Sequence, residues 1–150
     1  MATYKAISES DIEVLVSMMQ DFYAIDGYPI DVKKSRELFR KFIRESNLGQ
    51  CWSIEHEGKT AGYVILTFLF SFEFGGNIAF VDELFIKAEF RGKGIGKESI
   101  DFIQSEARKR DLKLLYLEVE PHNLAAKKLY KSKDFDEHKR QLMRYKPDNN

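Results

Sequence analysis

Three glycines lie within five residues, between a segment typical of a strand and a segment typical of an amphipathic helix. The loop is Gly92-Lys93-Gly94-Ile95-Gly96, and Arg91 and Lys97 flank it. Because glycine has no Cβ atom, such a backbone can approach a ligand closely. A loop that leads into a helix also presents free N–H groups at the positive end of the helix dipole. The sequence therefore predicts a strand–loop–helix unit that binds an anion, most readily a pyrophosphate.

The glycine spacing differs from two common nucleotide-binding loops. A Walker loop ends in Gly-Lys followed by Ser or Thr, and that ending is missing here. A dinucleotide-binding loop reads Gly-x-Gly-x-x-Gly after the first strand of a βαβ unit, whereas these glycines alternate and lie past mid-chain. The simpler alternative is a helix-starting turn whose lysines are only solvated, and the loop alone does not separate the two.

The hydrophobic pattern of the other segments predicts a single domain, residues 1–150, with α/β or α+β architecture. In chain order we expect a strand at 3–7, helices at 9–24 and 32–46, strands at 51–57, 60–72 and 78–87, a helix at 95–110, a strand at 114–120, a helix at 123–132 and one or two closing strands at 135–145. This order predicts a mixed sheet with helices on both faces. We expect the polar tail, residues 147–150, to fray.

Charge and cysteine content exclude several classes of function. The 24 basic and 24 acidic residues balance, although the first 75 residues carry 8 basic and 11 acidic groups. We therefore expect no nucleic-acid or membrane partner. A single cysteine, Cys51, excludes an internal disulfide and a thiolate-rich zinc site, and the three histidines lack metal-ligand spacing. The chain shows no signal-peptide pattern and no spanning apolar run, so we expect a cytoplasmic protein without a metal.

Two further segments, taken with the glycine loop, resemble the GNAT superfamily of acetyl-CoA-dependent N-acetyltransferases. Residues 91–96 resemble its Arg/Gln-x-x-Gly-x-Gly/Ala signature, and residues 80–86 resemble its central strand. Residues 118–130 resemble its C-terminal motif, Asn-x-x-Ala-x-x-x-Tyr. Where the family often has glycine before a phenylalanine, this chain has Asp134, which we expect to adopt the left-handed turn itself.

The resemblance implies a GNAT-like acyl-CoA N-acyltransferase fold that uses acetyl-CoA as acetyl donor. It implies that the sheet splays between the strands at 78–87 and 114–120, and that the pantetheine arm pairs there with the exposed backbone. Residues implied to contact acetyl-CoA are Leu84, Phe85, Ile86, Arg91, Gly92, Lys93, Gly94, Ile95, Gly96, Lys97, Asn123 and Ala126.

The resemblance also implies catalytic roles for three side chains. Asp82 is our first choice for the base that deprotonates the amine, and Glu83 is our second. Being adjacent on a strand, the two are expected to point to opposite faces, so that only one reaches a given cleft. Tyr130 is implied to protonate the departing sulfur, and the alternative is a tyrosine that only packs in the core.

The acceptor is expected to be a small amine, most readily a cationic one. Tyr23, Asp26, Tyr28 and Glu118 are candidates to bind it, the first three because they belong to the acidic first half of the chain. A protein lysine or N-terminal amine stays open as the acceptor. The chain could instead be a catalytically degenerate acyl-CoA-binding module with a sensing or assembly role. A homodimer also stays open.

Overall fold

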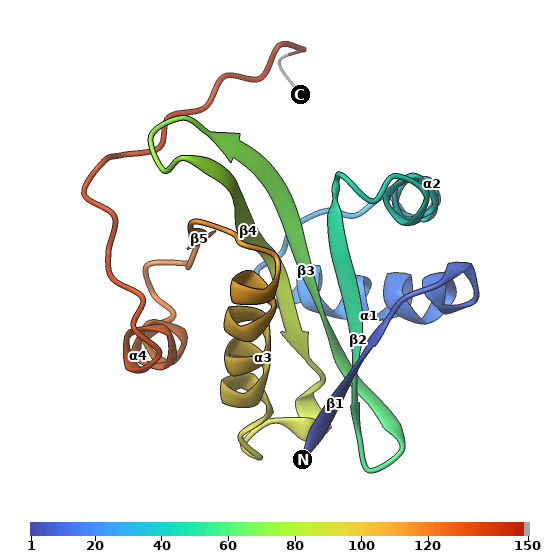
Figure 1. The fold of residues 1–150 in the computed structure, drawn as a ribbon. Coiled ribbons are helices and arrows are strands. Elements are labelled where there is room, and N and C mark those ends of the chain that lie inside the picture. Colours follow the sequence, from blue (N-terminus) through green and yellow to red (C-terminus); the bar gives the residue numbers. More distant parts are fainter. Residues whose placement is uncertain (149–150) are drawn as a thin grey trace.

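Five strands form one sheet in which each strand neighbours the next along the chain (Figure 1). The structure is a computed structural model that describes residues 1–148. Strands β1 to β4 pair antiparallel, and β5 pairs parallel to β4. The elements are β1 (Ala2–Ala6), η1 (Glu9–Asp11), α1 (Ile12–Ile25), α2 (Val32–Arg44), β2 (Gly49–His56), β3 (Lys59–Ser71), β4 (Gly76–Ile86), η2 (Ala88–Phe90), α3 (Ile95–Lys109), β5 (Leu115–Leu117) and α4 (Leu124–Ser132).

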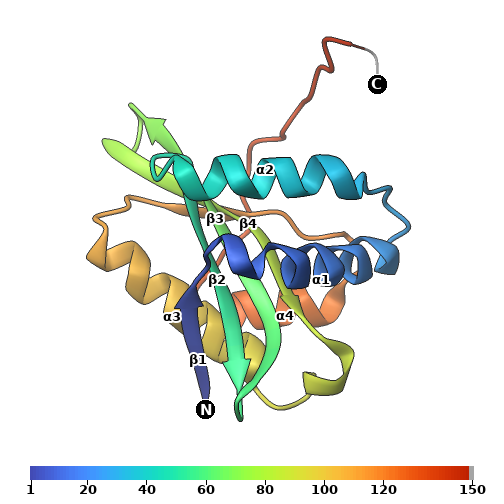
Figure 2. The same ribbon diagram turned by 90° about the vertical axis from the view of Figure 1, so that its right-hand side faces the viewer.

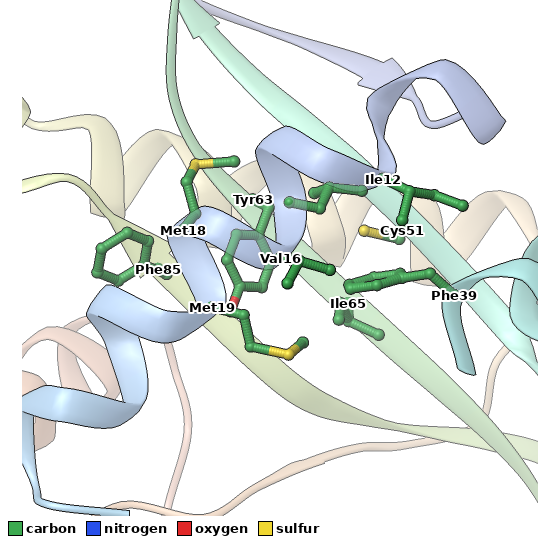
Figure 3. Packing of buried hydrophobic residues seen from close by; sticks show 10 residues of the cluster. Ile12, Val16, Met18, Met19, Phe39, Cys51, Tyr63, Ile65 and Phe85 are labelled. Carbon is green, nitrogen blue, oxygen red and sulfur yellow. The ribbon is translucent and has the colours of Figure 1, made fainter. Parts of the chain in front are cut away.

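Helices cover both faces of the sheet, which confirms the predicted mixed-sheet architecture (Figures 1 and 2). Helices α1 and α2 pack on one face over a core that includes Leu15, Phe39 and Tyr63 (Figure 3). Helix α3 packs on the other face over a second core that includes Trp52 and Ile100, with Tyr130 of α4 against it. No helix among residues 1–148 is long and apolar enough to cross a membrane.

Strand β4 carries a bulge at the centre of the sheet. Glu83 pairs with Ile65 and Val81 pairs with Leu66, so Asp82 is an extra residue with no partner of its own on β3. A bulge bends the strand and re-aims the side chains next to it. Accordingly, Val81 packs with the α3 core, and Phe85, four residues later, packs with the α1 core.

Strand β5 is shorter than predicted and covers only part of the outer edge of β4. Its three residues pair with Ala79, Phe80 and Val81, and β4 then continues without it to Ile86. The splay that the resemblance implies is therefore present. It leaves the outer backbone edge of β4 beyond Val81 without a neighbouring strand in residues 1–148.

The prediction of closing strands at 135–145 is wrong, because this segment contains no strand. Its side-chain contacts include a ring contact of His138 with Tyr116, at 5.4 Å between centroids, and ion pairs of Arg140 with Glu73 at 2.8 Å and of Glu137 with Lys131 at 3.3 Å. Consecutive apolar residues, Leu142-Met143, break the alternation that a half-buried strand needs. Of the tail expected to fray, residues 147–148 form a turn and residues 149–150 lie outside the described residues.

Local turn chemistry follows the sequence closely. Asp134 has φ 67°, which confirms the left-handed turn expected where the family often has glycine. Glu57 and Gly58 both have positive φ, at 51° and 75°, and they close the β2–β3 hairpin. Two positive φ angles in succession match the right-handed twist of the flanking strands.

Replacing Gly62 with alanine should strongly destabilise the sheet. An added Cβ would lie 2.0 Å from the carbonyl oxygen of Phe85, which is backbone and can move only by disturbing the β3–β4 ladder. We expect the free energy of unfolding to fall by roughly 3 kcal/mol, the upper range for overpacking. Gly58→Ala is the control, because its Cβ would meet no atom within 4 Å and it carries only the backbone strain of φ +75°. Denaturant unfolding of both variants measures the difference, and equal losses would contradict it.

Candidate active site

The glycine loop has the geometry of an anion-binding turn. Gly92 and Gly94 have φ angles of 77° and 80°, a left-handed backbone that favours glycine. A Cβ at either position would meet no atom within 4 Å, so the loop faces open space. Helix α3 begins at Ile95, and its first backbone bond runs from Glu98 N to Gly94 O. In the part of the chain that the structure describes, the N–H groups of residues 92–97 have no backbone acceptor, so they are free for a ligand.

Arg91 ties this loop to the end of β4. Its Nε donates a hydrogen bond to the Ile86 carbonyl oxygen at 3.0 Å, and its guanidinium lies 5.9 Å from the centre of the Phe85 ring. On the far side of the loop, a Cβ at Gly96 would lie 3.5 Å from Leu129 of α4. Arg91 thus holds one side of the loop against β4, and Gly96 lies next to α4 on the other side.

The side chains of the loop divide into exposed cations and a buried anchor. Lys93 and Lys97 are exposed, and the Lys93 ammonium lies 5.6 Å from the centre of the Phe90 ring. Ile95 is buried in the α3 core, so only its backbone is available to an anion. The lysines therefore add positive charge to a cradle that the backbone forms.

The unpaired edge of β4 runs from the bulge toward this loop. Leu84 and Ile86 are half-buried and pack with the α3 core, while Phe85 is buried with the α1 core. A pocket of about 600 Å³ lies along the α1 side of this edge. Its lining includes Phe85, Lys87 and Arg91 together with Asp21 of α1. The pocket therefore lies between α1 and the end of β4, next to Arg91 at the start of the glycine loop, and the candidate acceptor residues do not line it.

The bulge interrupts the alternation on which the expectation of opposite faces for Asp82 and Glu83 rests. The Glu83 carboxylate lies on the α1 side of the sheet, because it bonds to Tyr23 of α1 and to Tyr63 of the α1 core. That Asp82 points to the other face stays a prediction.

Glu83 is half-buried and receives two phenol hydrogen bonds. Tyr23 Oη donates to Oε2 at 2.6 Å, and Tyr63 Oη donates to Oε1 at 2.7 Å. Burial raises the pKa of Glu83, the two phenol donors lower it, and the charge of Asp82 raises it. Burial is also the main cause that raises the pKa of each tyrosine, so both remain protonated donors.

Asp82 stands in a more open environment than Glu83. Much of its surface is exposed, yet its pKa is raised, first by partial desolvation and second by the carboxylate of Glu118. Glu118 itself is exposed, one residue beyond the end of β5. A cation that enters between these two groups would relieve their repulsion.

The loop between α1 and α2 meets the segment after β5 across the splay. Tyr28 donates a hydrogen bond to Glu120 Oε1, and His122 Nε2 lies 3.5 Å from Asp26 Oδ1. Together with Tyr23 and Glu118, these contacts bring the candidate acceptor residues to the same end of the sheet. The sequence analysis missed Glu120 and His122 as their partners, although their positions beside Glu118 in the motif are the signal that could have found them.

The remaining candidates lie on α4 or at its N-cap, and within the described residues none of their side chains forms a hydrogen bond to Asp82 or Glu83. Asn123 caps this helix, since its side chain accepts a hydrogen bond from Ala126 N at 3.1 Å. Tyr130 is half-buried with its ring 5.9 Å from that of Phe135, and burial raises its pKa. Its hydroxyl has no hydrogen-bond partner in the described chain. The role of Tyr130 as an acid stays a prediction, as do the cofactor roles of Asn123 and Ala126.

The residues present fit the acyl-CoA donor that the resemblance implies. The loop offers free N–H groups with open space before them, and the β4 edge offers unpaired backbone beyond Val81. Within residues 1–148 no three His, Cys, Asp or Glu side chains are grouped so that they could hold a metal ion. Cys51 is buried beneath the site, and burial raises the pKa of its thiol, as suits a packing residue.

Comparison with known proteins agrees with this geometry. The chain is 26% identical over 149 residues to an uncharacterized N-acetyltransferase in the pepI 3′ region of Lactobacillus delbrueckii subsp. lactis, covering 88% of this chain and 84% of that relative. Its fold matches an integron cassette protein from the mobile metagenome of Cole Harbour Salt Marsh with a TM-score of 0.86, 26% identity, and coverage of 96% of this chain and 90% of that one. It also matches a predicted acetyltransferase with acetyl-CoA from Clostridium acetobutylicum, with a TM-score of 0.80, 19% identity and coverage of 97% and 96%. The family described as Acetyltransferase (GNAT) family matches residues 15–135, and this chain belongs to it.

Proposed function

We propose that this protein is an acetyl-CoA-dependent N-acetyltransferase that acetylates a small, cationic amine by direct transfer in a ternary complex. The observation that carries the proposal is the unpaired end of β4. It joins the anion-binding loop at one end to two carboxylates of the bulge at the other. A donor held along this edge would present its acyl group beside groups that can bind and deprotonate an amine.

The chain's own residues hold the donor in two places. Free N–H groups of residues 92–97 bind the pyrophosphate, and Lys93 and Lys97 add positive charge. The backbone of residues 84–86 pairs with the pantetheine arm, and Arg91 keeps the loop in register with that edge. When bound, acetyl-CoA supplies an acetyl group activated as a thioester.

The two carboxylates bind the acceptor and accept its proton, and Tyr130 supplies a proton to the leaving group. A simple amine is protonated near neutral pH and cannot attack, so a base must first remove a proton. Glu83 takes this proton from the acceptor ammonium, and Asp82 with Glu118 holds the cation in place. The amine nitrogen forms its bond to the carbonyl carbon as the carbon–sulfur bond breaks. The Tyr130 hydroxyl donates a proton to the departing sulfur and regains one from the nitrogen, which loses its second proton as the amide forms. A β4 amide N–H stabilises the charge on the carbonyl oxygen.

The direct test measures release of the CoA thiol from acetyl-CoA in the presence of a panel of amines. We expect release that depends on the amine, and an acetylated amine by mass spectrometry. Acetyl-CoA that binds without any thiol release across small amines, peptide lysines and peptide N-termini would favour the degenerate binding module. Release with peptides alone would favour the protein acetyltransferase.

A negative side chain in the glycine loop should abolish tight binding of acetyl-CoA. Gly94→Glu places a carboxylate where the pyrophosphate is expected. Charge-assisted hydrogen bonds contribute roughly 1.5–3 kcal/mol each, so loss of several should weaken binding at least about a hundredfold. Gly75→Glu is the matched control, because Gly75 has a similar φ of 81° and equally open space but lies in the β3–β4 turn. Calorimetry that finds equal affinity for the two folded variants would contradict the proposed pyrophosphate site.

Tyr130→Phe should keep the fold and the affinity for acetyl-CoA but lower kcat. The ring still packs against Phe135, and only the hydroxyl is lost. General acid catalysis contributes about 10²–10⁴-fold, and we expect about a hundredfold loss because a thiolate is a fair leaving group. Single-turnover rates isolate the chemical step from product release. A rate within twofold of the wild type would leave Tyr130 as a packing residue.

A diamine should be a better acceptor than a matched monoamine, and salt should reduce the difference. After partial desolvation, the charge of Glu118 is the second cause that raises the pKa of Asp82, and exposed charges of this kind are screened beyond about 8–10 Å at physiological salt. Glu118→Gln and Asp26→Asn should each lower the preference by about 1.4-fold to fivefold, as exposed charges contribute roughly 0.2–1 kcal/mol. Glu57→Gln, in the β2–β3 turn, is the control for a lost surface charge. The measurement is kcat/KM for the two amines at low and high salt. If the diamine is not preferred, the electrostatic explanation is contradicted, and the shape of the site would determine which acceptor is used.

A further inference from the structure

We propose that Tyr23 and Tyr63 are positioning residues that hold the Glu83 carboxylate ionised and in one orientation toward the acceptor amine. This inference rests on the proposed function, because it assigns how the base of that reaction is prepared. Each phenol occupies a different carboxylate oxygen, at 2.6 Å for Tyr23 and 2.7 Å for Tyr63. Both torsional freedom and proton affinity of Glu83 are therefore set by two residues far from it in sequence.

The two donors come from separate elements that hold them firmly. Tyr63 lies on β3 with no exposed surface, and its ring stands among core side chains between the sheet and α1 (Figure 3). Its ring centre is 5.9 Å from that of Phe85 and 6.4 Å from that of Phe22. Tyr23 comes from the last turns of α1, with its ring centre 6.0 Å from that of Phe22. Rigid donors on opposite sides fix the plane of the carboxylate between them.

The surroundings of Glu83 make these donors necessary. The charged and titratable groups around it are Asp82 on β4, the Cys51 thiol on β2 and, through Asp82, Glu118 after β5. In the described chain no lysine, arginine or histidine forms an ion pair with Glu83. A half-buried carboxylate beside a second carboxylate would otherwise be driven toward its neutral form. The phenols oppose this by donating hydrogen bonds to the charged form.

The same arrangement leaves Glu83 able to accept a proton. Each carboxylate oxygen has two lone pairs, and each phenol occupies one of them. Burial raises the pKa of both tyrosines, so neither phenol competes for the proton of the ammonium at working pH. The proton moves from the amine nitrogen to a carboxylate oxygen, and the nitrogen keeps the electron pair that forms the new bond.

A merely structural role makes a different prediction. Buried tyrosine hydroxyls usually require a partner, so Glu83 could serve only to satisfy Tyr63. In that case Tyr63→Phe changes the stability of the protein and the titration of Glu83, but leaves the pH profile of the reaction where it was. The positioning role requires both to move, and in the same direction.

The first arm of the test follows the Glu83 carboxyl directly by ¹³C NMR, with its signal assigned by loss in Glu83→Gln. In Tyr23→Phe and in Tyr63→Phe we expect the titration midpoint to rise by about one pH unit, since a hydrogen bond to a charged group contributes roughly 1.5 kcal/mol or more and one pKa unit corresponds to about 1.36 kcal/mol. Tyr4→Phe is the matched control, because Tyr4 is a partly buried tyrosine whose hydroxyl lies 3.1 Å from Ser99 Oγ, away from Glu83. A midpoint that stays in place in both variants, or rises equally in Tyr4→Phe, overturns the inference.

The second arm follows the acidic limb of kcat/KM with two amines of different pKa. The limb that does not change with the amine belongs to the enzyme, and it should rise with the NMR midpoint in Tyr23→Phe and Tyr63→Phe. An NMR midpoint that rises while this limb stays fixed overturns the positioning role. If no amine is acetylated by the wild type, the proposed function fails, while the NMR arm still decides whether the two phenols control the Glu83 carboxylate.

Discussion

The departure of β4 from regular pairing is the constraint on which the rest of the site depends. On its β3 side the strand gains one residue at Asp82, and on its β5 side it loses its neighbour after Val81. The first change breaks the alternation of side chains at Asp82 and Glu83, and the second leaves backbone donors and acceptors free along residues 84–86. A sheet normally pairs such groups, because unpaired buried backbone costs about as much as a lost hydrogen bond. The irregular strand therefore creates both the acidic groups and the edge that a donor can occupy.

Features determined by a few neighbouring residues could be read from the sequence. Glycines that start a helix, the asparagine cap at Asn123 and the left-handed turn at Asp134 all follow from local backbone preferences, and the structure contains each of them. The element order as far as α4 was predictable for the same reason, since hydrophobic periodicity is local. The splay between β4 and β5 came from family resemblance, because nothing in the spacing of residues 114–120 shows where a parallel strand stops pairing.

Features that depend on register or on distant partners could not be read from the sequence. The bulge is a relation between β3 and β4, so the simple alternation rule that was applied to Asp82 and Glu83 does not hold at this point of the strand. The phenols that bond Glu83 lie 60 and 20 residues before it, and no local pattern links them to it. In residues 135–145 a strand was predicted where none exists. Their mixture of apolar and polar residues suggested a strand. Strand β5, however, has only three paired residues, so it offers a further strand too short an edge to pair with.

The two adjacent carboxylates are placed in environments that suit different tasks in the proposed reaction. Asp82 is open to solvent and its pKa is raised by partial desolvation and by the charge of Glu118, so it can attract a cation from solution and gains from having one nearby. Glu83 lies deeper, holds no cation of its own in the described chain and is kept ionised by two rigid donors. A cation drawn in by Asp82 and Glu118 would meet Glu83 as the next available proton acceptor. The bulge and the unpaired edge are parts of one strand, so the group proposed to attract the amine and the group proposed to deprotonate it both lie next to the edge that a donor can occupy.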